Sequence, residues 1–328
     1  MPLSPSADPA PALAEGAGRI LRLATDDEST GPSAQPRGAM HVRLYHFPTS
    51  LCSQKVRLAL AEKGVAWQST IVNIGPAHEQ LQPWYAQINP RLVVPTLVLD
   101  DEVVTDSRQI VESIDRRFPG PTLIPAELAD EVMRWVDLQD RLPMRELELA
   151  QTKGLVRWLR RWGLKQKRKQ LRKLIRKQPE LAAVYQAKLD DLDQLERAVA
   201  GHAATRELVD EIEVVLDGLE HHLGEHRWLA GDRYTLADLV WTAVIARLEH
   251  IGFARTMAAH RRPHIADWYA RLRERPSWDA MVRRLTVGQA LRYYGPAVLK
   301  TFLLVWVLKW VVVIGLGWAL TAIDCGGG

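Results

Sequence analysis

The chain has 328 residues, 47% of them hydrophobic and 25% charged, which is long enough for about two globular domains with buried cores. Its two cysteines, Cys52 and Cys325, are too few for a disulfide framework or a metal cage, so we expect a reducing compartment and no bound metal. The net charge of +4 reflects one segment, because residues 153–177 hold twelve Lys and Arg and no acid. Elsewhere acidic residues outnumber basic ones, so no nucleic-acid partner is expected.

The first third of the chain divides into a leader and a compact α/β unit. Residues 1–40 are rich in Pro, Ala, Ser and Gly without a sustained apolar run, which predicts a disordered leader. Strand and helix patterns then follow in the order βαβαββα, which predicts an α/β domain over 41–122. The expected strands are 41–47, 67–74, 95–99 and 102–105, and the expected helices are 52–64, 78–88 and 107–118.

The second part is expected to be all-helical. Beyond Glu127 the strand signals end and long segments with helical spacing of apolar residues take over, which predicts a helical domain over 123–285. One of these segments begins with Thr235-Leu-Ala-Asp238, a pattern in which the Thr hydroxyl accepts from the third amide and Asp238 reaches back to the Thr235 amide.

The first candidate for chemistry is Ser50-Leu51-Cys52-Ser53, at the junction of the first strand and the first helix. Backbone amides and the helix dipole favour negative charge there, so a thiol at this position ionises readily and becomes a nucleophile. The same amides could hold the thiolate of a bound small thiol. A buried, inert Cys52 is an equally good interpretation of the spacing.

Two further positions have both a structural and a functional interpretation. Pro95 opens a strand, which suits a plain turn, but a cis Val94–Pro95 bond with free backbone groups could pair with an extended peptide ligand. Asp106-Ser107 precedes a helix and is typical of an N-cap. Its exposed amides and the Ser107 hydroxyl could instead bind a carboxylate.

Three strings in this order resemble the glutathione S-transferase superfamily: SLCSQKVRLALAEKG, NPRLVVPTLVLDDEVVTDSRQIVESI and RYTLADLVWTAVIARLE. The resemblance covers residues 41 to about 280. Within the superfamily, S-x-C-S, VVPTLV and QPELAAVYQAK are similar to tetrachlorohydroquinone reductive dehalogenases. A body of this kind followed by an apolar C-terminal helix also resembles ganglioside-induced differentiation-associated proteins.

The resemblance implies a thioredoxin-like, glutathione-binding first domain and glutathione as co-substrate, and it is compatible with a homodimer. Ser50 or Cys52 would activate glutathione, and in the dehalogenase pattern Cys52 attacks a glutathionyl adduct. Val94, beside a cis Pro95, would pair with the cysteinyl unit. Asp106 and Ser107 would hold the γ-glutamyl end, and Arg91 would bind the glycyl carboxylate. Many members have Glu where this chain has Asp106.

Two segments suggest contact with a membrane. Residues 153–177 combine an apolar stripe with cations, which is typical of a helix on a lipid surface or partner, or of a solvated extension packed on the body. Residues 298–323 are apolar except for Lys300 and Lys309, and at about 1.5 Å per residue they could cross a bilayer core. Arg283, Arg284 and Arg292 precede this stretch. We therefore predict a single transmembrane helix with the folded body on the cytoplasmic side.

The sequence thus favours a membrane-tethered, glutathione-dependent transferase. It would act on a small electrophile by conjugation, thiol transfer or reductive dehalogenation, with Cys52 as the working thiol. The alternative is a non-catalytic, membrane-anchored adapter that has kept the fold and uses the basic segment for contact.

Overall fold

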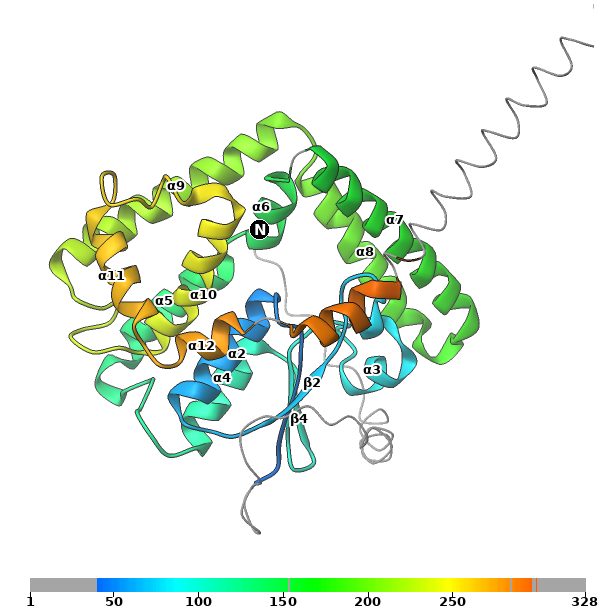
Figure 1. The fold of residues 1–328 in the computed structure, drawn as a ribbon, viewed down its shortest axis with the longest axis horizontal. Helices are drawn as coiled ribbons and strands as arrows, with labels where there is room; N and C mark the ends of the chain where they lie inside the picture. Colours follow the sequence, from blue (N-terminus) through cyan, green and yellow to red (C-terminus); the bar gives the residue numbers. More distant parts are fainter. Residues whose placement is uncertain (1–39, 153, 284, 297–298, 300–328) are drawn as a thin grey trace, which may run out of the picture. The chain divides into compact units, whose positions relative to one another are not determined.

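The structure is a computed structural model that describes residues 40–152, 154–283, 285–296 and 299 (Figure 1). Residues 40–74 and 78–283 belong to one compact unit, which carries every candidate site residue. Residues 75–77 belong to a second unit together with the described residues beyond 284. That unit contains a helix over 287–296, which begins with reciprocal hydrogen bonds between Thr286 and Gln289 (3.0 and 3.2 Å).

Four strands form a mixed sheet in the order β2-β1-β3-β4. Their bounds are β1 (Val42–His46), β2 (Gln68–Ile71), β3 (Thr96–Leu99) and β4 (Glu102–Val104). Strand β1 runs parallel to β2 and antiparallel to β3, and Leu44 lies opposite both Ser69 and Leu97. Every residue of β1 and β3 is buried, because both faces of these central strands are covered.

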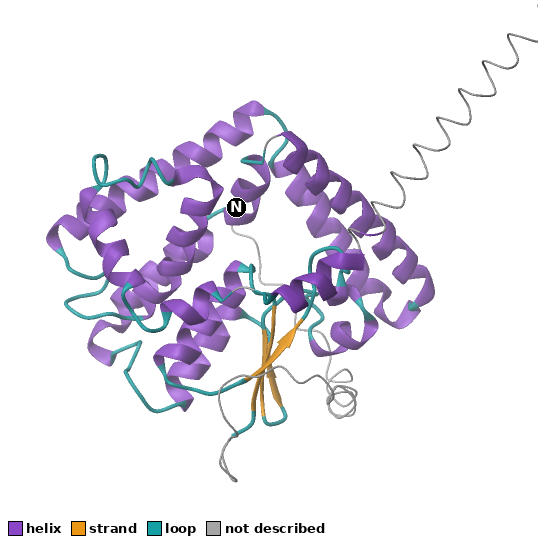
Figure 2. Cartoon of the chain, viewed as in Figure 1, coloured by secondary structure: helices purple, strands orange, loops and turns teal. Residues whose placement is uncertain are grey.

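Helices cover the two faces of the sheet, as Figure 2 shows. They are α2 (Leu51–Glu62) and α4 (Ser107–Arg117) on one face, and α3 (Pro83–Ile88), preceded by the short turn η2 (Glu79–Leu81), on the other. Successive side chains of a strand point to opposite faces of the sheet, so neighbouring residues of β1 contact different helices. Leu44 packs into the core with α2 and α4, whereas Tyr45 joins Tyr85 and Ile88 of α3. The predicted order βαβαββα is found in the structure.

The rest of the compact unit is helical. Its helices are α5 (Ala129–Arg141), α6 (Met144–Ala150), α7 (Gly154–Lys177), α8 (Ala182–Ala198), α9 (His202–Glu225), α10 (Leu236–Leu248), α11 (Pro263–Arg273) and α12 (Trp278–Val282), with short turns η3 (Ala126–Leu128), η4 (Pro179–Leu181) and η5 (Glu249–Phe253). Helix α10 is buried on nearly every side and packs against α2 and α5. One hydrophobic core therefore runs from the sheet into the helical part.

Helices α7 and α8 form a hairpin with a smaller core of its own. Leu171 of α7 and Leu189 of α8 pack there with Leu81 and Leu92 of the first part. The apolar stripe predicted in 153–177 is thus divided along the helix. Its C-terminal half packs on the body, whereas Trp158 and Trp162 in the N-terminal half are 60% and 50% exposed.

The predicted transmembrane helix, and the membrane location that depended on it, are wrong for the residues that the structure describes. A bilayer span needs about 20 consecutive, mainly apolar residues. None of the described helices is long and apolar enough, and the long helix α7 carries charges along its whole length. The predicted span at 298–323 lies, apart from Leu299, outside the described residues.

Candidate functional site

The loop after β1 places Ser50 and Cys52 at the start of α2. Ser50 is the N-cap, and its hydroxyl oxygen accepts a hydrogen bond from the Ser53 amide at 3.4 Å. A hydroxyl also has a proton to donate, and among the described residues that proton has no acceptor. Cys52, one residue further into the helix than Leu51, is half-buried and has a free thiol. A thiolate at this point would meet the amides of the first helical turn.

Two arginines fix the backbone of this loop. The buried Arg57 of α2 donates to the carbonyls of Pro48 (2.8 Å) and Met281 (2.6 Å). Arg247, near the end of α10, donates to the carbonyl of Thr49 and forms an ion pair with Glu148 of α6 (3.3 Å). The position of Ser50 and Cys52 is therefore set partly by the helical part of the molecule. The sequence analysis missed Arg247, because nothing in its local pattern links it to residues nearly 200 positions earlier.

The second loop carries Val94 and Pro95. The peptide bond between them is cis, and both residues are buried. Tyr85 and Asn89 brace the loop from below, since each donates to the Val93 carbonyl (2.7 and 2.9 Å) and each hydrogen-bonds Thr96 Oγ1 (2.9 Å). Within the described part of the chain, the backbone N–H and C=O of Val94 have no hydrogen-bond partner. An extended peptide could pair with these groups.

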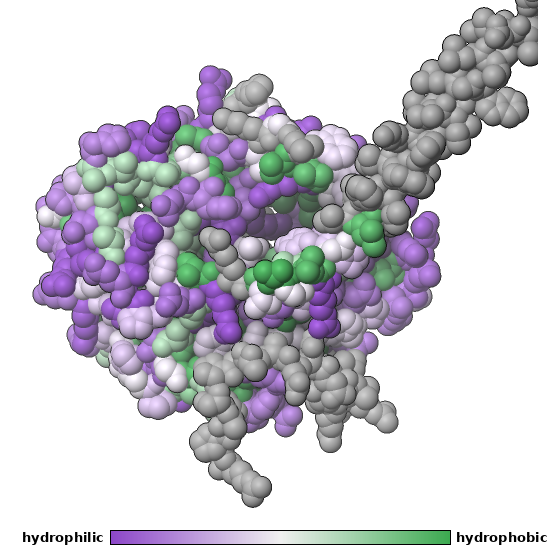
Figure 3. All heavy atoms as spheres, in the orientation of Figure 1, coloured by the Kyte–Doolittle hydropathy of each residue, from purple (hydrophilic) through white to green (hydrophobic). Residues whose placement is uncertain are grey.

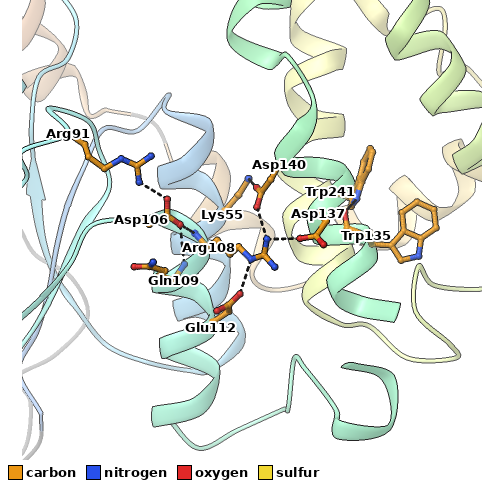
Figure 4. A network of polar contacts seen from close by, with 10 residues as sticks. All are labelled: Lys55, Arg91, Asp106, Arg108, Gln109, Glu112, Trp135, Asp137, Asp140 and Trp241. Atoms are coloured by element: carbon orange, nitrogen blue, oxygen red, sulfur yellow. Dashed lines mark hydrogen bonds and ion pairs between the residues drawn. The ribbon is translucent and has the colours of Figure 1, made fainter. Parts of the chain in front are cut away.

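The third loop leads into α4. Asp106 caps this helix by accepting from the amides of Arg108 (3.0 Å) and Gln109 (3.3 Å), and its other oxygen accepts from Arg91 (2.7 Å; Figure 4). Partial burial acts to raise the pKa of Asp106, but these hydrogen bonds outweigh it and the pKa is lowered. The amide and hydroxyl of Ser107 have no partner among the described residues and can serve as donors to an anion.

Beneath this cap a charge network joins three helices, as Figure 4 shows. Arg108 of α4 forms ion pairs with Glu112 (3.0 Å) and with Asp137 of α5 (2.6 Å). The buried Lys55 of α2 pairs with Asp140 of α5 at 3.5 Å. The network connects the start of α4 with α2 and α5, and so fixes the cap relative to the helix that carries Cys52.

The sheet brings the three loops to one end. Tyr45 of β1 lies opposite Thr96 of β3, and Leu97 of β3 lies opposite Val104 of β4. Because both pairs are antiparallel, the residues after β1, before β3 and after β4 share one edge. The predicted residues Ser50, Cys52, Val94, Pro95, Asp106 and Ser107 therefore gather there. Arg91 lies at this edge too, where its guanidinium forms an ion pair with Asp106.

Comparison with protein families gives two matches. Residues 44–122 match the model of the glutathione S-transferase N-terminal domain, and residues 196–276 match that of the glutathione S-transferase C-terminal domain. The segment between the two matches contains α5 to α7 and most of α8.

Named relatives cover most of the chain. It is 31% identical over 240 residues to the tetrachloro-p-hydroquinone reductive dehalogenase of Sphingobium chlorophenolicum, spanning 73% of this chain and 94% of the relative. It is 25% identical to the human ganglioside-induced differentiation-associated protein 1-like 1, over 81% of this chain and 80% of that protein. Among solved structures, a beta-etherase from Sphingobium sp. strain SYK-6 superposes with a TM-score of 0.58 over 74% of this chain and 98% of that one, at 24% identity. That likeness concerns the fold alone.

Proposed function

The chain belongs to the glutathione S-transferase superfamily, and from this premise we propose that it transfers the sulfur of glutathione to or from a small electrophile with Cys52 as the working thiol. That the chain is an enzyme using glutathione follows from its family domains and from relatives named as transferases and reductive dehalogenases. The roles of individual residues are our proposal. The observation that carries it is the half-buried Cys52 thiol at the start of α2, beside the Ser50 hydroxyl whose proton is unused.

In the proposed binding mode glutathione lies along the shared edge of the sheet. The unpartnered backbone groups of Val94, next to Pro95, pair with its cysteinyl unit. The amide and hydroxyl of Ser107 bind the γ-glutamyl carboxylate, and Asp106 accepts from the neighbouring ammonium group. Arg91 binds the glycyl carboxylate. Its present ion pair with Asp106 is no obstacle, since Arg91 is 62% exposed and such pairs contribute about 0–1 kcal/mol.

Conjugation then needs only a thiolate and a leaving group. The Ser50 hydroxyl donates to the glutathione thiolate, which attacks the electrophilic carbon. A carbon–sulfur bond forms, the bond from carbon to the leaving group breaks, and the leaving group departs with the electron pair. The Cys52 thiol is not consumed in this step.

Cys52 acts when the glutathionyl adduct is to be reduced. Its thiolate attacks the adduct sulfur, the carbon–sulfur bond breaks, and the carbon takes the electron pair and a proton. This leaves a mixed disulfide between Cys52 and glutathione. A second glutathione thiolate attacks that disulfide and releases glutathione disulfide and the Cys52 thiolate. Two glutathione molecules thus supply the two electrons.

The first prediction separates these two steps. Cys52→Ser should abolish thiol exchange with a mixed disulfide of glutathione, because a hydroxyl cannot replace the attacking thiolate. Glutathione affinity, measured by calorimetry, and the rate of conjugation to 1-chloro-2,4-dinitrobenzene should change less than about threefold, since neither needs this thiol. Cys325→Ser is the matched control, as it removes the chain's other cysteine and should leave all three quantities unchanged.

Each outcome has a distinct meaning. Thiol exchange that persists in Cys52→Ser refutes the role of Cys52 as working thiol. A wild-type protein that binds glutathione but performs neither reaction would support the alternative, a non-catalytic adapter.

A further inference from the structure

The helical part contributes a group of charged side chains that the mechanism above does not use. Arg145 of α6 binds Asp191 of α8 through both guanidinium nitrogens (3.0 and 3.1 Å), and Lys188 of α8 donates to the same carboxylate at 2.9 Å. Lys167 of α7 completes the group, for its pKa responds to the charges of Lys188, Arg145 and Asp191. Two cations thus bind one carboxylate, and a third lies near them, because Leu171, one helical turn after Lys167, packs with Leu189, the neighbour of Lys188. Even with Glu146 counted beside Asp191, the group keeps an excess of positive charge.

Lys167 is the member of this group whose charge is not neutralised. Its Nζ has no hydrogen bond or ion pair to any residue that the structure describes, although its side chain is partly buried. Burial and the charges of Lys188 and Arg145 lower the pKa of Lys167 to about 7, while Asp191 acts in the opposite direction. A bound anion would relieve this repulsion and restore the charge of Lys167.

The group lies on the helix that is tied to the loop before Cys52, because Glu148, one helical turn after Arg145, pairs with Arg247, which donates to the carbonyl of Thr49. Burial acts to lower the pKa of Arg145, whereas the hydrogen bonds and charge of Asp191, then the charge of Glu146 and last that of Cys52, act to raise it. Arg145 is 55% exposed, so its guanidinium remains accessible from solvent. The space-filling view shows the surface hollowed between α6 and α8, with hydrophilic side chains on the floor of the hollow (Figure 3).

Hydrophobic packing holds α7 and α8, which carry two of these cations, against the loops of the first part. Leu171, one helical turn after Lys167, and Leu189, next to Lys188, pack against Leu81 and Leu92. Leu92 directly follows Arg91, and the charge of Arg91 contributes to lowering the pKa of Lys188, after burial and against the effect of Asp191. The α7–α8 hairpin is thus held against the glutathione-side loops by its own core.

From these contacts we propose that Arg145, Lys167 and Lys188 bind the anionic group, a carboxylate or a phenolate, of the electrophile that the enzyme conjugates. This inference rests on the proposed function, because it takes an electrophile to be present beside Cys52. All three cations lie between the two segments that match the family models, at 44–122 and 196–276, on α6, α7 and α8. Asp191 positions Arg145 and Lys188 through its hydrogen bonds to both side chains.

The test compares an anionic ligand with its neutral ester in the full chain. The probes are 3,5-dinitrobenzoate and its methyl ester, which bear no leaving group, and binding is followed by quenching of tryptophan fluorescence. Lys167→Gln should weaken binding of the benzoate about tenfold or more, since it removes a charge-assisted contact. Binding of the ester should not change. Lys167→Arg should retain benzoate binding, and the exposed Lys169→Gln on the same helix is the matched control.

Three results would overturn the proposal. These are equal binding of ester and benzoate by the wild type, unchanged benzoate binding in Lys167→Gln, and an equal loss in Lys169→Gln. A loss of glutathione affinity in Lys167→Gln with benzoate binding intact would also overturn it, because the cations would then hold the glycyl carboxylate.

Turnover is measured separately with the 4-chloro derivatives of the same two probes. There the glutathione thiolate displaces chloride, which leaves with the bonding electron pair. If the wild type does not conjugate even the chloro ester, the proposed function fails. The anion site is judged by the binding experiment alone, so the two failures can be told apart.

Discussion

Two carboxylates cap helices in this molecule, one in each half, and they do so in opposite surroundings. Asp106 caps α4 at the edge of the sheet, where its side chain is 34% exposed and forms an ion pair with the exposed Arg91. Asp238 lies in the first turn of α10 and is fully buried. It accepts from the amides of Leu229 and Thr235 and from the indole of Trp268, all at 3.0 Å.

A carboxylate at the start of a helix thus serves two different purposes in this molecule. All of the strong donors around Asp238 come from the protein, so its carboxylate is committed to the fold. Asp106 and its neighbour Ser107 keep groups that face solvent and can exchange a protein partner for a ligand. We therefore expect changes at Asp238 to affect stability and changes at Asp106 to affect glutathione binding.

The largest effect is expected for Asp238→Ala. It leaves three buried donors without an acceptor, which should lower the free energy of unfolding by about 3 kcal/mol or more. Urea unfolding monitored by circular dichroism measures this loss. The control is Asp232→Ala, an exposed aspartate in the preceding loop, which should change stability by less than about 0.5 kcal/mol. A loss below about 1 kcal/mol at Asp238 would erase the contrast between the two caps.

A smaller effect is expected from pH, and its sign should differ between the caps. Burial raises the pKa of Asp238 to about 6 against the opposing hydrogen bonds, so its contribution to stability is present at low pH and is lost as pH rises from about 4 through 6. The pKa of Asp106 is lowered, so its contribution is present above about pH 4 and is lost as pH falls.

Urea unfolding across about pH 3 to 7 tests these signs with isosteric variants. The stability of the wild type relative to Asp238→Asn should fall as pH rises. Relative to Asp106→Asn it should rise over the acidic part of the range. Two curves of the same sign would contradict the assignment of one cap to the core and the other to the site.

The smallest effect on stability is expected at Asp106. Asp106→Ala should cost about 1 kcal/mol, the usual loss for an exposed cap, whereas Asp106→Asn should cost almost nothing because Asn caps equally well. Both variants should weaken glutathione binding about tenfold by calorimetry, since both remove the charge that faces the γ-glutamyl ammonium. If Asp106→Asn binds glutathione like the wild type, Asp106 is a cap and nothing more.

Local patterns in the sequence predicted much of the fold. The strand predicted at 41–47 is found as β1, although its burial on both faces was not predicted. The Thr235–Asp238 spacing predicted the start of α10, where Asp238 reaches back to the Thr235 amide as expected. The predicted membrane span is wrong for the described residues, since none of their helices is long and apolar enough to cross a bilayer. The apolar run that predicted the span lies, apart from Leu299, outside those residues.

The sequence alone determined the kinds of groups at the site and their order along the chain: a thiol and a hydroxyl at one helix start, a proline before a strand, and a carboxylate and a hydroxyl at another helix start. These signals are local, since caps, breakers and periodicity act over a few residues. Only the tertiary structure decided that Arg247 holds the loop before α2, that Arg91 pairs with Asp106, and that Arg145 and Lys188 share Asp191. Such contacts depend on helix packing across tens to hundreds of residues, and a charged residue in a sequence does not reveal which charge it will meet.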